Sequence, residues 1–150
     1  MGLVQKLILT VIGIALFSYI DNAKPLVNVA SCICGVSAFF VSELTTPWLG
    51  NGFAMYFISA TVTCFLAETG ARIMRVPVTV LLLPAIIPLV PGAILYNAVR
   101  ALMLGQEEWY TAYGSEALRA TAGIGSAIVT VSAIVRVTYA YIRRIRCLRE

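Results

Sequence analysis

The sequence predicts an all-α, polytopic integral membrane protein with about five transmembrane helices, the fourth of them broken at a cluster of prolines. Two observations carry this prediction. Of the 150 residues, 60% are hydrophobic and only 12% are charged, which leaves too few charges to cover a water-soluble domain of this length. The apolar residues also gather into runs of about 20, the number that a helix needs to cross the hydrocarbon of a bilayer.

Five such runs follow one another, and we expect them to form a single transmembrane domain over residues 1–150. No small-residue cleavage site follows the first run, so we expect it to be a retained span rather than a signal peptide. The third run is near the lower length limit for a span. In order, the runs cover residues 3–20, 25–44, 51–67, 79–104 and 118–142.

Basic residues mark one side of the predicted bundle. An arginine cluster follows the last run, and loops that alternation places on the same side carry further basic residues. By the positive-inside rule we expect a cytoplasmic C-terminus and, with an odd number of spans, an external N-terminus. We therefore attribute the net charge of +4 to orientation in the membrane and do not expect nucleic-acid binding. Lys6, which is expected on the outer side, is the exception to the positive-inside pattern. The residues concerned are Lys24, Arg72, Arg75, Arg143, Arg144, Arg146 and Arg149.

The fourth run contains the element PAIIPLVPG, residues 84–92. A proline in a helix interior removes a backbone donor and clashes with the carbonyl four residues earlier, at a cost of about 3 kcal/mol. Three prolines should therefore leave carbonyls such as that of Ile87 without partners. We expect one half-helix from Thr79 toward Ile87 and a second that restarts near Pro91 or Gly92.

Such a break suits a binding element, although a simple kink satisfied by neighbouring helices is the alternative. The N-terminus of a restarted helix attracts carboxylates, and freed carbonyls attract cations or ammonium groups. Two polar residues one turn beyond the break can line the same cavity. The candidate substrate-binding residues are Pro84, Pro88, Pro91, Gly92, Tyr96 and Asn97.

Four charged residues are candidates for coupling or for binding a charged substrate. The chain has no histidine, so a proton-coupled carrier would need a carboxyl group. Glu68 precedes Arg72 by four residues, which favours an ordinary ion pair on one helix, whereas Glu43 has no obvious local partner. The two arginines either snorkel to the surface or face a cavity. The candidates are Glu43, Glu68, Arg100 and Arg136.

Two further features concern the end of the chain. Residues 105–117, GQEEWYTAYGSEA, are the longest expected loop, anchored at the membrane surface by their aromatic side chains. In the last run, Ala122, Ser126 and Thr130 recur every four residues beside Gly123 and Ala127. Small residues at this spacing predict close approach of another helix, from this chain or another.

Residues 76–106, VPVTVLLLPAIIPLVPGAILYNAVRALMLGQ, strongly resemble the signature region of the threonine/serine exporter family. A PxxPxxPG-like element followed by Tyr recurs in that family, and here it reads IIPLVPGAILY. The chain is most similar to the small, separately encoded membrane subunit, which corresponds to the C-terminal half of the fused exporters. The bacterial two-subunit succinate exporter has a similar arrangement. The resemblance extends more weakly over the whole chain, through GIALFSYI and Pro25.

The resemblance implies a subunit of a two-component secondary transporter in the bacterial cytoplasmic membrane. It implies export of threonine and serine driven by the proton gradient, a larger partner subunit in a hetero-oligomer, a small carboxylate-bearing substrate and no cofactor. Two alternatives stay open: a dicarboxylate (succinate) exporter subunit, and an accessory membrane subunit that does not itself transport.

A membrane enzyme is not expected. Enzymes that act on lipid phosphates or peptide bonds need clustered carboxylates, a metal-binding set, or a nucleophile with a base. The sequence contains no such pattern, and its four cysteines have no zinc or redox spacing. We therefore assign no catalytic residue and no metal ligand.

Overall fold

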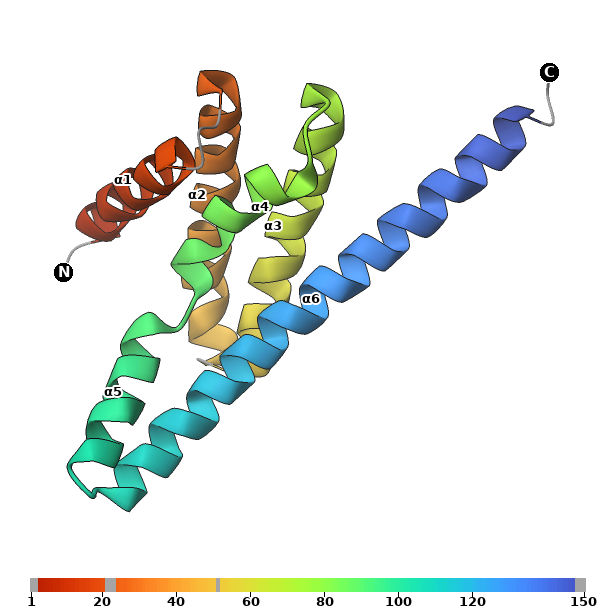
Figure 1. Cartoon of the computed structure of the whole chain (residues 1–150). Coiled ribbons are helices and arrows are strands. Elements are labelled where there is room, and N and C mark those ends of the chain that lie inside the picture. The colour runs from red at the N-terminus through yellow and green to blue at the C-terminus, as the bar shows by residue number, and fades with distance from the viewer. Residues whose placement is uncertain (1–2, 21–23, 51, 148–150) are drawn as a thin grey trace.

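The computed structural model of the chain describes residues 3–20, 24–50 and 52–147, which form helices joined by short turns (Figure 1). Within these residues there is no β-strand. In chain order the elements are α1 (Leu3–Ile20), α2 (Pro25–Leu49), α3 (Phe53–Met74), α4 (Val78–Ile86), the 3-10 helix η1 (Ile87–Leu89), α5 (Gly92–Met103) and α6 (Glu107–Cys147).

The predicted all-α membrane fold is confirmed. Among the described residues, α2, α3 and α6 are long and apolar enough to cross a membrane, and α4 and α5 qualify together as one bent span. The remaining apolar helix, α1, is shorter. These five units coincide with the five predicted runs. The second and third runs continue further than predicted, to Leu49 and Met74, because Pro47 and Gly70 do not end their helices.

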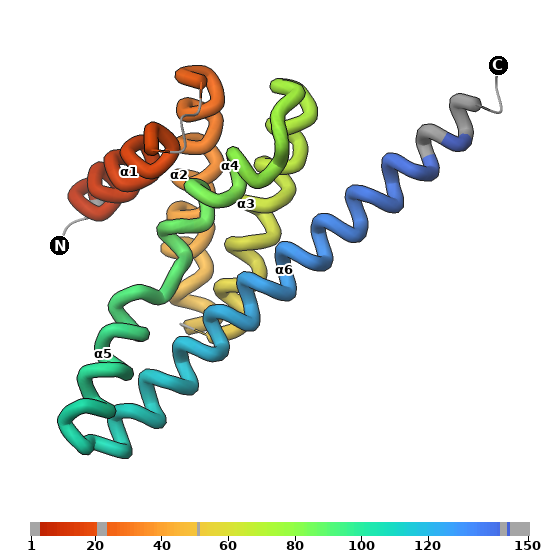
Figure 2. Tube along the Cα trace, viewed as in Figure 1, coloured from red at the N-terminus to blue at the C-terminus, as the bar shows by residue number. Residues whose placement is uncertain are grey.

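The helices pack around α2 and α3, which lie side by side and antiparallel (Figure 1). The short α1 packs on α2, and α4 leans across both α2 and α3. The long α6 runs diagonally past α3, and its C-terminal end extends beyond the other helices (Figures 1 and 2). The contact between α3 and α6 is the most extensive in the chain.

The fourth span is broken where the prolines predict it. The chain turns by 57° between the α4–η1 segment and α5, and the second half-helix begins at Gly92. The expectation of a free carbonyl at Ile87 is wrong, because this oxygen accepts a hydrogen bond from the Val90 N–H at 3.2 Å. A further bond joins the Gly92 N–H to the Val90 carbonyl at 2.8 Å. The tight turn thus replaces part of the pairing that the prolines remove.

The expected loop over residues 105–117 is helical instead. Gly105, at a φ of 67°, turns the chain after α5, and the Gln106 N–H closes the turn on the Ala101 carbonyl at 2.9 Å. The helix α6 begins directly afterwards, with Glu107 and Glu108 in its first turn. Negative side chains at that position interact favourably with the helix dipole. Only three residues therefore connect α5 to a helix of 41 residues.

Close approach of α3 and α6 depends on Gly123. A β-carbon at this position would lie 2.8 Å from the Phe53 carbonyl oxygen and 3.0 Å from Cβ of Tyr56. Ala127 is fully buried on the same face. The predicted close packing of the last span is thus made within this chain by Gly123 and Ala127, whereas Ala122 and Thr130 are exposed.

We expect Gly123→Ala to destabilise the protein by about 1–3 kcal/mol, because the added methyl group forces α6 away from the α3 backbone. Gly125→Ala is the matched control on the same helix, since nothing lies within 4 Å of its β-carbon. Thermal unfolding of both variants in detergent checks this expectation. Equal melting temperatures for the two variants would contradict it.

Candidate functional site

A cavity of about 350 Å³ lies against the break in the fourth span. Its walls come from α1, α2, α3, η1 and the segment that connects η1 to α5. The lining includes two charged side chains and three hydroxyl groups. The lining residues are Lys6, Phe39, Ser42, Glu43, Thr46, Met55, Tyr56, Pro88, Leu89, Val90 and Pro91.

An ion pair between α1 and α2 forms the charged part of this cavity. Lys6 Nζ lies 2.8 Å from Glu43 Oε1, although the two residues are 37 positions apart in sequence. Their side chains are 47% and 35% exposed, so both remain accessible from the cavity. Glu43 therefore has the partner that its sequence neighbours do not offer.

Lys6 lines this cavity but is not among the candidate site residues that the sequence indicates. In the sequence it stands out only as a basic residue on the wrong side for the positive-inside rule. This exception to the positive-inside rule is the sequence signal for Lys6, because a cation on the outer side is expected to have a nearby anionic partner. The structure supplies the reason in the carboxylate of Glu43 at 2.8 Å.

Hydroxyl groups complete the polar wall. Ser42 and Thr46 on α2 donate to carbonyls of their own helix at 2.7 Å and 2.6 Å, which leaves their oxygen lone pairs as acceptors. Tyr56 adds a phenol from α3. Because Pro47 has no N–H, it cannot pair with the Glu43 carbonyl one turn earlier. The site thus offers a cation, a carboxylate and several hydroxyl oxygens.

The opposite wall is the broken backbone itself. Pro88 and Pro91 line the cavity, and α5 begins immediately after Pro91. The first N–H groups of a helix have no partner within that helix. The restart therefore brings donors and the positive end of the helix dipole close to this wall. Gly92 is exposed at the first position of α5.

The other residues of the predicted set lie elsewhere. Pro84 is buried inside α4. Tyr96 and Asn97 do not line the cavity at the break: Tyr96 is on an exposed face of α5, and Asn97 faces a separate cavity of about 220 Å³ beside α6 together with Arg100. Arg136 is exposed on α6 and belongs to neither cavity.

The ion pair expected within α3 is present. Arg72 Nη1 lies 2.6 Å from Glu68 Oε2, and Glu68 is only 7% exposed. Two contacts link this pair to α6: Ser132 Oγ is 3.5 Å from Glu68 Oε1, and the Arg72 guanidinium lies over the Tyr139 ring at 4.2 Å. The pair therefore holds α3 against α6, away from the break.

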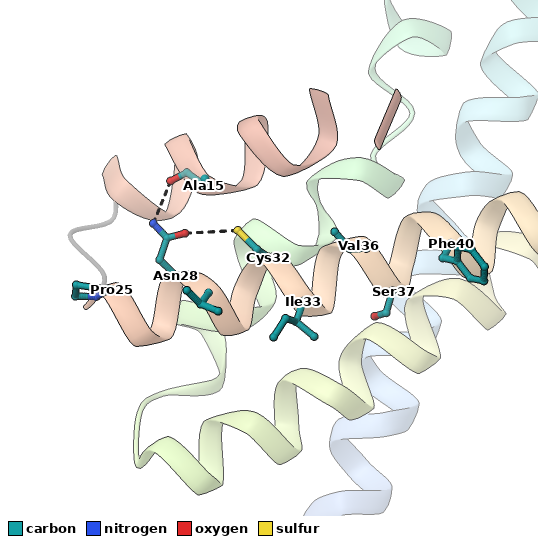
Figure 3. A pocket seen from close by; sticks show the side chains of 9 residues that line it. Ala15, Pro25, Asn28, Cys32, Ile33, Val36, Ser37 and Phe40 are labelled. Atoms are coloured by element: carbon teal, nitrogen blue, oxygen red, sulfur yellow. Dashed lines mark hydrogen bonds between the residues drawn. The ribbon is translucent and has the colours of Figure 1, made fainter. Parts of the chain in front are cut away.

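Another cavity, of about 770 Å³, is an apolar groove along α2 (Figure 3). Asn28 is the most polar side chain of the groove, and both groups of its amide already have hydrogen-bond partners. The amide donates to the Ala15 carbonyl of α1 at 3.3 Å and accepts from the Cys32 thiol at 3.6 Å, as Figure 3 shows. A groove with this lining suits hydrocarbon rather than a charged substrate. Within the described part of the chain, no group of His, Cys, Asp or Glu side chains has the geometry to hold a metal ion.

We expect Arg72→Ala to destabilise the protein by about 2–3 kcal/mol, because it leaves the buried Glu68 carboxylate without its partner. Adding Glu68→Gln should recover at least half of this loss, since it removes the uncompensated charge. Arg136→Ala, an exposed arginine on α6, is the control and should change little. Thermal unfolding of the four proteins in detergent measures the effect. No recovery in the double variant would argue against the pairing.

Comparison with known proteins identifies the family of the chain. A family model described as threonine/serine exporter, ThrE, matches residues 6–134. This range begins at Lys6 and includes every residue that lines the cavity at the break. Neither a curated protein nor a solved structure matches the chain. The family match covers most of the sequence, and the chain belongs to the threonine/serine exporter family.

Proposed function

We propose that the chain is one subunit of a two-component secondary transporter that exports threonine and serine, and that the cavity at the break receives the substrate. Membership of the exporter family supports transport in a lipid bilayer rather than enzymatic catalysis. The observation that carries the substrate proposal is the Lys6–Glu43 pair on the cavity wall. It places one positive and one negative group beside the broken helix.

This charge pattern complements an α-amino acid. The substrate carboxylate binds Lys6 and the N-terminal end of α5, where donors and the helix dipole favour an anion. The substrate ammonium group binds the carboxylate of Glu43. Ser42, Thr46 and Tyr56 then supply partners for the side-chain hydroxyl that threonine and serine share. Binding at the break thus exchanges an internal ion pair for two ion pairs with the substrate.

A dicarboxylate fits the same cavity less well. One of its carboxylates can bind Lys6, but the second meets the negative charge of Glu43. Like charges held close together in a partly desolvated site repel strongly. Succinate export therefore stays the second candidate, and it requires that Glu43 be protonated.

We propose that Glu43 is also the coupling group. It is the carboxyl group in the cavity lining, and a proton on it would weaken its hold on Lys6 and on a substrate ammonium group. A proton gradient can thereby drive substrate release on one side of the membrane. Glu68 is less suited to this role, because it is buried in its pair with Arg72.

We further propose that the whole chain is one domain that works beside a larger, separately encoded subunit in the bacterial cytoplasmic membrane, with its C-terminus in the cytoplasm. The start of α2 and the end of α3 lie at the end of the bundle toward which α6 runs (Figure 1). Lys24 caps that start of α2, Arg72 and Arg75 are at that end of α3, and Arg144 is in the last turn of α6. This distribution supports the orientation by the positive-inside rule. The resemblance of the chain to the C-terminal half of the fused exporters supports a partner that provides the other half.

Transport by purified components tests the proposal. Proteoliposomes that contain this chain and the larger subunit should export labelled threonine or serine when a pH gradient is imposed, and liposomes with either chain alone should not. Flux of succinate alone would replace the amino-acid assignment by the dicarboxylate one. Absence of flux for all three compounds, with both chains assembled, would contradict the substrate assignment and leave either an accessory role or another substrate.

We expect Lys6→Gln and Glu43→Gln each to lower transport at least tenfold, because each removes a charge that the zwitterion needs. Their stability should change little, since a partly exposed ion pair contributes roughly 1 kcal/mol or less. Lys24→Gln, a lysine outside the cavity lining, is the matched control. Initial rates of threonine flux at several concentrations provide the measurement. Wild-type rates in both cavity variants would remove this pair from the site.

Replacing the residues of the break separates transport from assembly. We expect Pro88→Ala and Pro91→Ala to reduce transport while the two subunits still co-purify, because an unbroken helix closes the cavity wall and removes the free N–H groups. Pro25→Ala, a proline at the start of α2 outside the lining of this cavity, is the control. Loss of co-purification in the break variants would instead indicate that the break serves assembly.

A further inference from the structure

A second polar cavity, of about 220 Å³, lies where α5 turns into α6. It contains a guanidinium group, two amide side chains and two aromatic rings. The rings of Trp109 and Tyr113 are stacked, with their centroids 5.9 Å apart. Among the described residues no acidic side chain lies within ion-pair distance of Arg100. The lining residues are Asn97, Arg100, Ala101, Leu104, Gln106, Trp109 and Tyr113.

An apolar groove of about 330 Å³ continues from this cavity along the exposed face of α5. Tyr96, Val99 and Met103 line it, and the groove and the cavity share Arg100 and Leu104. The residues recur at the spacing of one helix face. Tyr96 is 68% and Met103 84% exposed, so α6 does not cover this face.

We propose that these two adjoining spaces bind one phospholipid whose headgroup carries a phosphodiester and an ammonium group. The phosphate binds the Arg100 guanidinium, whose planar donors match phosphate oxygens. An acyl chain lies in the groove along Val99 and Tyr96, which leads from Arg100 toward the break. An amphiphile fits because Arg100 stands at the junction of the polar cavity and the apolar groove.

The groups around the cavity favour an ammonium-bearing headgroup over one with negative charge only. The faces of Trp109 and Tyr113 can hold a cation through their π-electrons. Glu107 and Glu108 follow Gln106 directly, are exposed, and lie outside the lining. Their carboxylates would repel additional negative charge. Trp and Tyr also concentrate at the membrane–water interface, which is where phospholipid headgroups lie.

The length of the groove agrees with a lipid that enters from the surrounding bilayer. Residues 96 and 103 are seven positions apart on α5, which corresponds to about 10 Å along the helix axis. The groove therefore covers only the upper part of an acyl chain. This site is separate from the cavity at the break, since no residue lines both. The inference is thus independent of the transported substrate.

Native mass spectrometry of the full chain tests the proposal. The protein is reconstituted in nanodiscs that contain phosphatidylethanolamine and is then released in mild detergent. We expect one retained lipid per chain, and at least about tenfold lower retention in Arg100→Gln, because a charged hydrogen-bond network is lost. Arg119→Gln, an exposed arginine on α6 outside both spaces, is the control and should retain the lipid. Equal retention in Arg100→Gln and wild type would overturn the proposal.

A second variant tests the groove by itself. Val99→Trp fills it without changing the polar cavity, and since Val99 is 55% exposed, the helix should fold normally. We expect lipid retention to fall by a similar factor. Soluble glycerophosphoethanolamine should compete at least about a hundredfold more weakly than the lipid, because it lacks the acyl chains.

Three other results would overturn the inference. Equal binding of the soluble headgroup would indicate a phosphate site rather than a lipid site. Displacement of the bound lipid by threonine would indicate a substrate site. Release of a second protein chain by Arg100→Gln, with lipid retention unchanged, would indicate a protein interface.

Discussion

The requirement that every backbone polar group in a membrane find a partner determines this structure. Most of the described chain meets it with long helices, whose hydrogen bonds are internal. Residues 87–91 cannot, because Pro88 and Pro91 remove two donors within this short stretch. The turn at Val90 and Gly92 restores part of the pairing. The backbone groups that stay unpaired must be covered by other parts of the protein. The polar side chains of the cavity, from α1, α2 and α3, lie against the break.

Charged side chains within the bundle also need partners. Lys6 and Glu43 pair across two helices beside the break, and Glu68 and Arg72 pair within α3. These pairs differ in what surrounds them. The second is buried and held by Ser132 and Tyr139 of α6, which makes it a structural link. The first is open to a cavity, so its charges remain available to a ligand.

The sequence allowed the helices, the break and the Glu68–Arg72 pair to be predicted, because each depends on residues close together in the chain. Hydrophobic runs, proline spacing and an i, i+4 pair are all local signals. The Lys6–Glu43 pair could not be predicted, since it joins residues 37 positions apart and depends on how α1 lies against α2. Tyr96 and Asn97 were expected at the break, but the 57° bend turns α5 away from it.

The bend also gives α5 its two environments. Its first turn adjoins the cavity at Pro91, whereas its last turns carry Asn97 and Arg100 to the hairpin with α6. The hairpin between α5 and α6 brings Arg100 near Trp109, because only three residues separate the two helices. The prolines therefore create the first space by leaving the backbone open, and the short hairpin creates the second at the other end of α5. The single short helix α5 thus joins the cavity at the break to the cavity at the hairpin, and its two ends serve different environments.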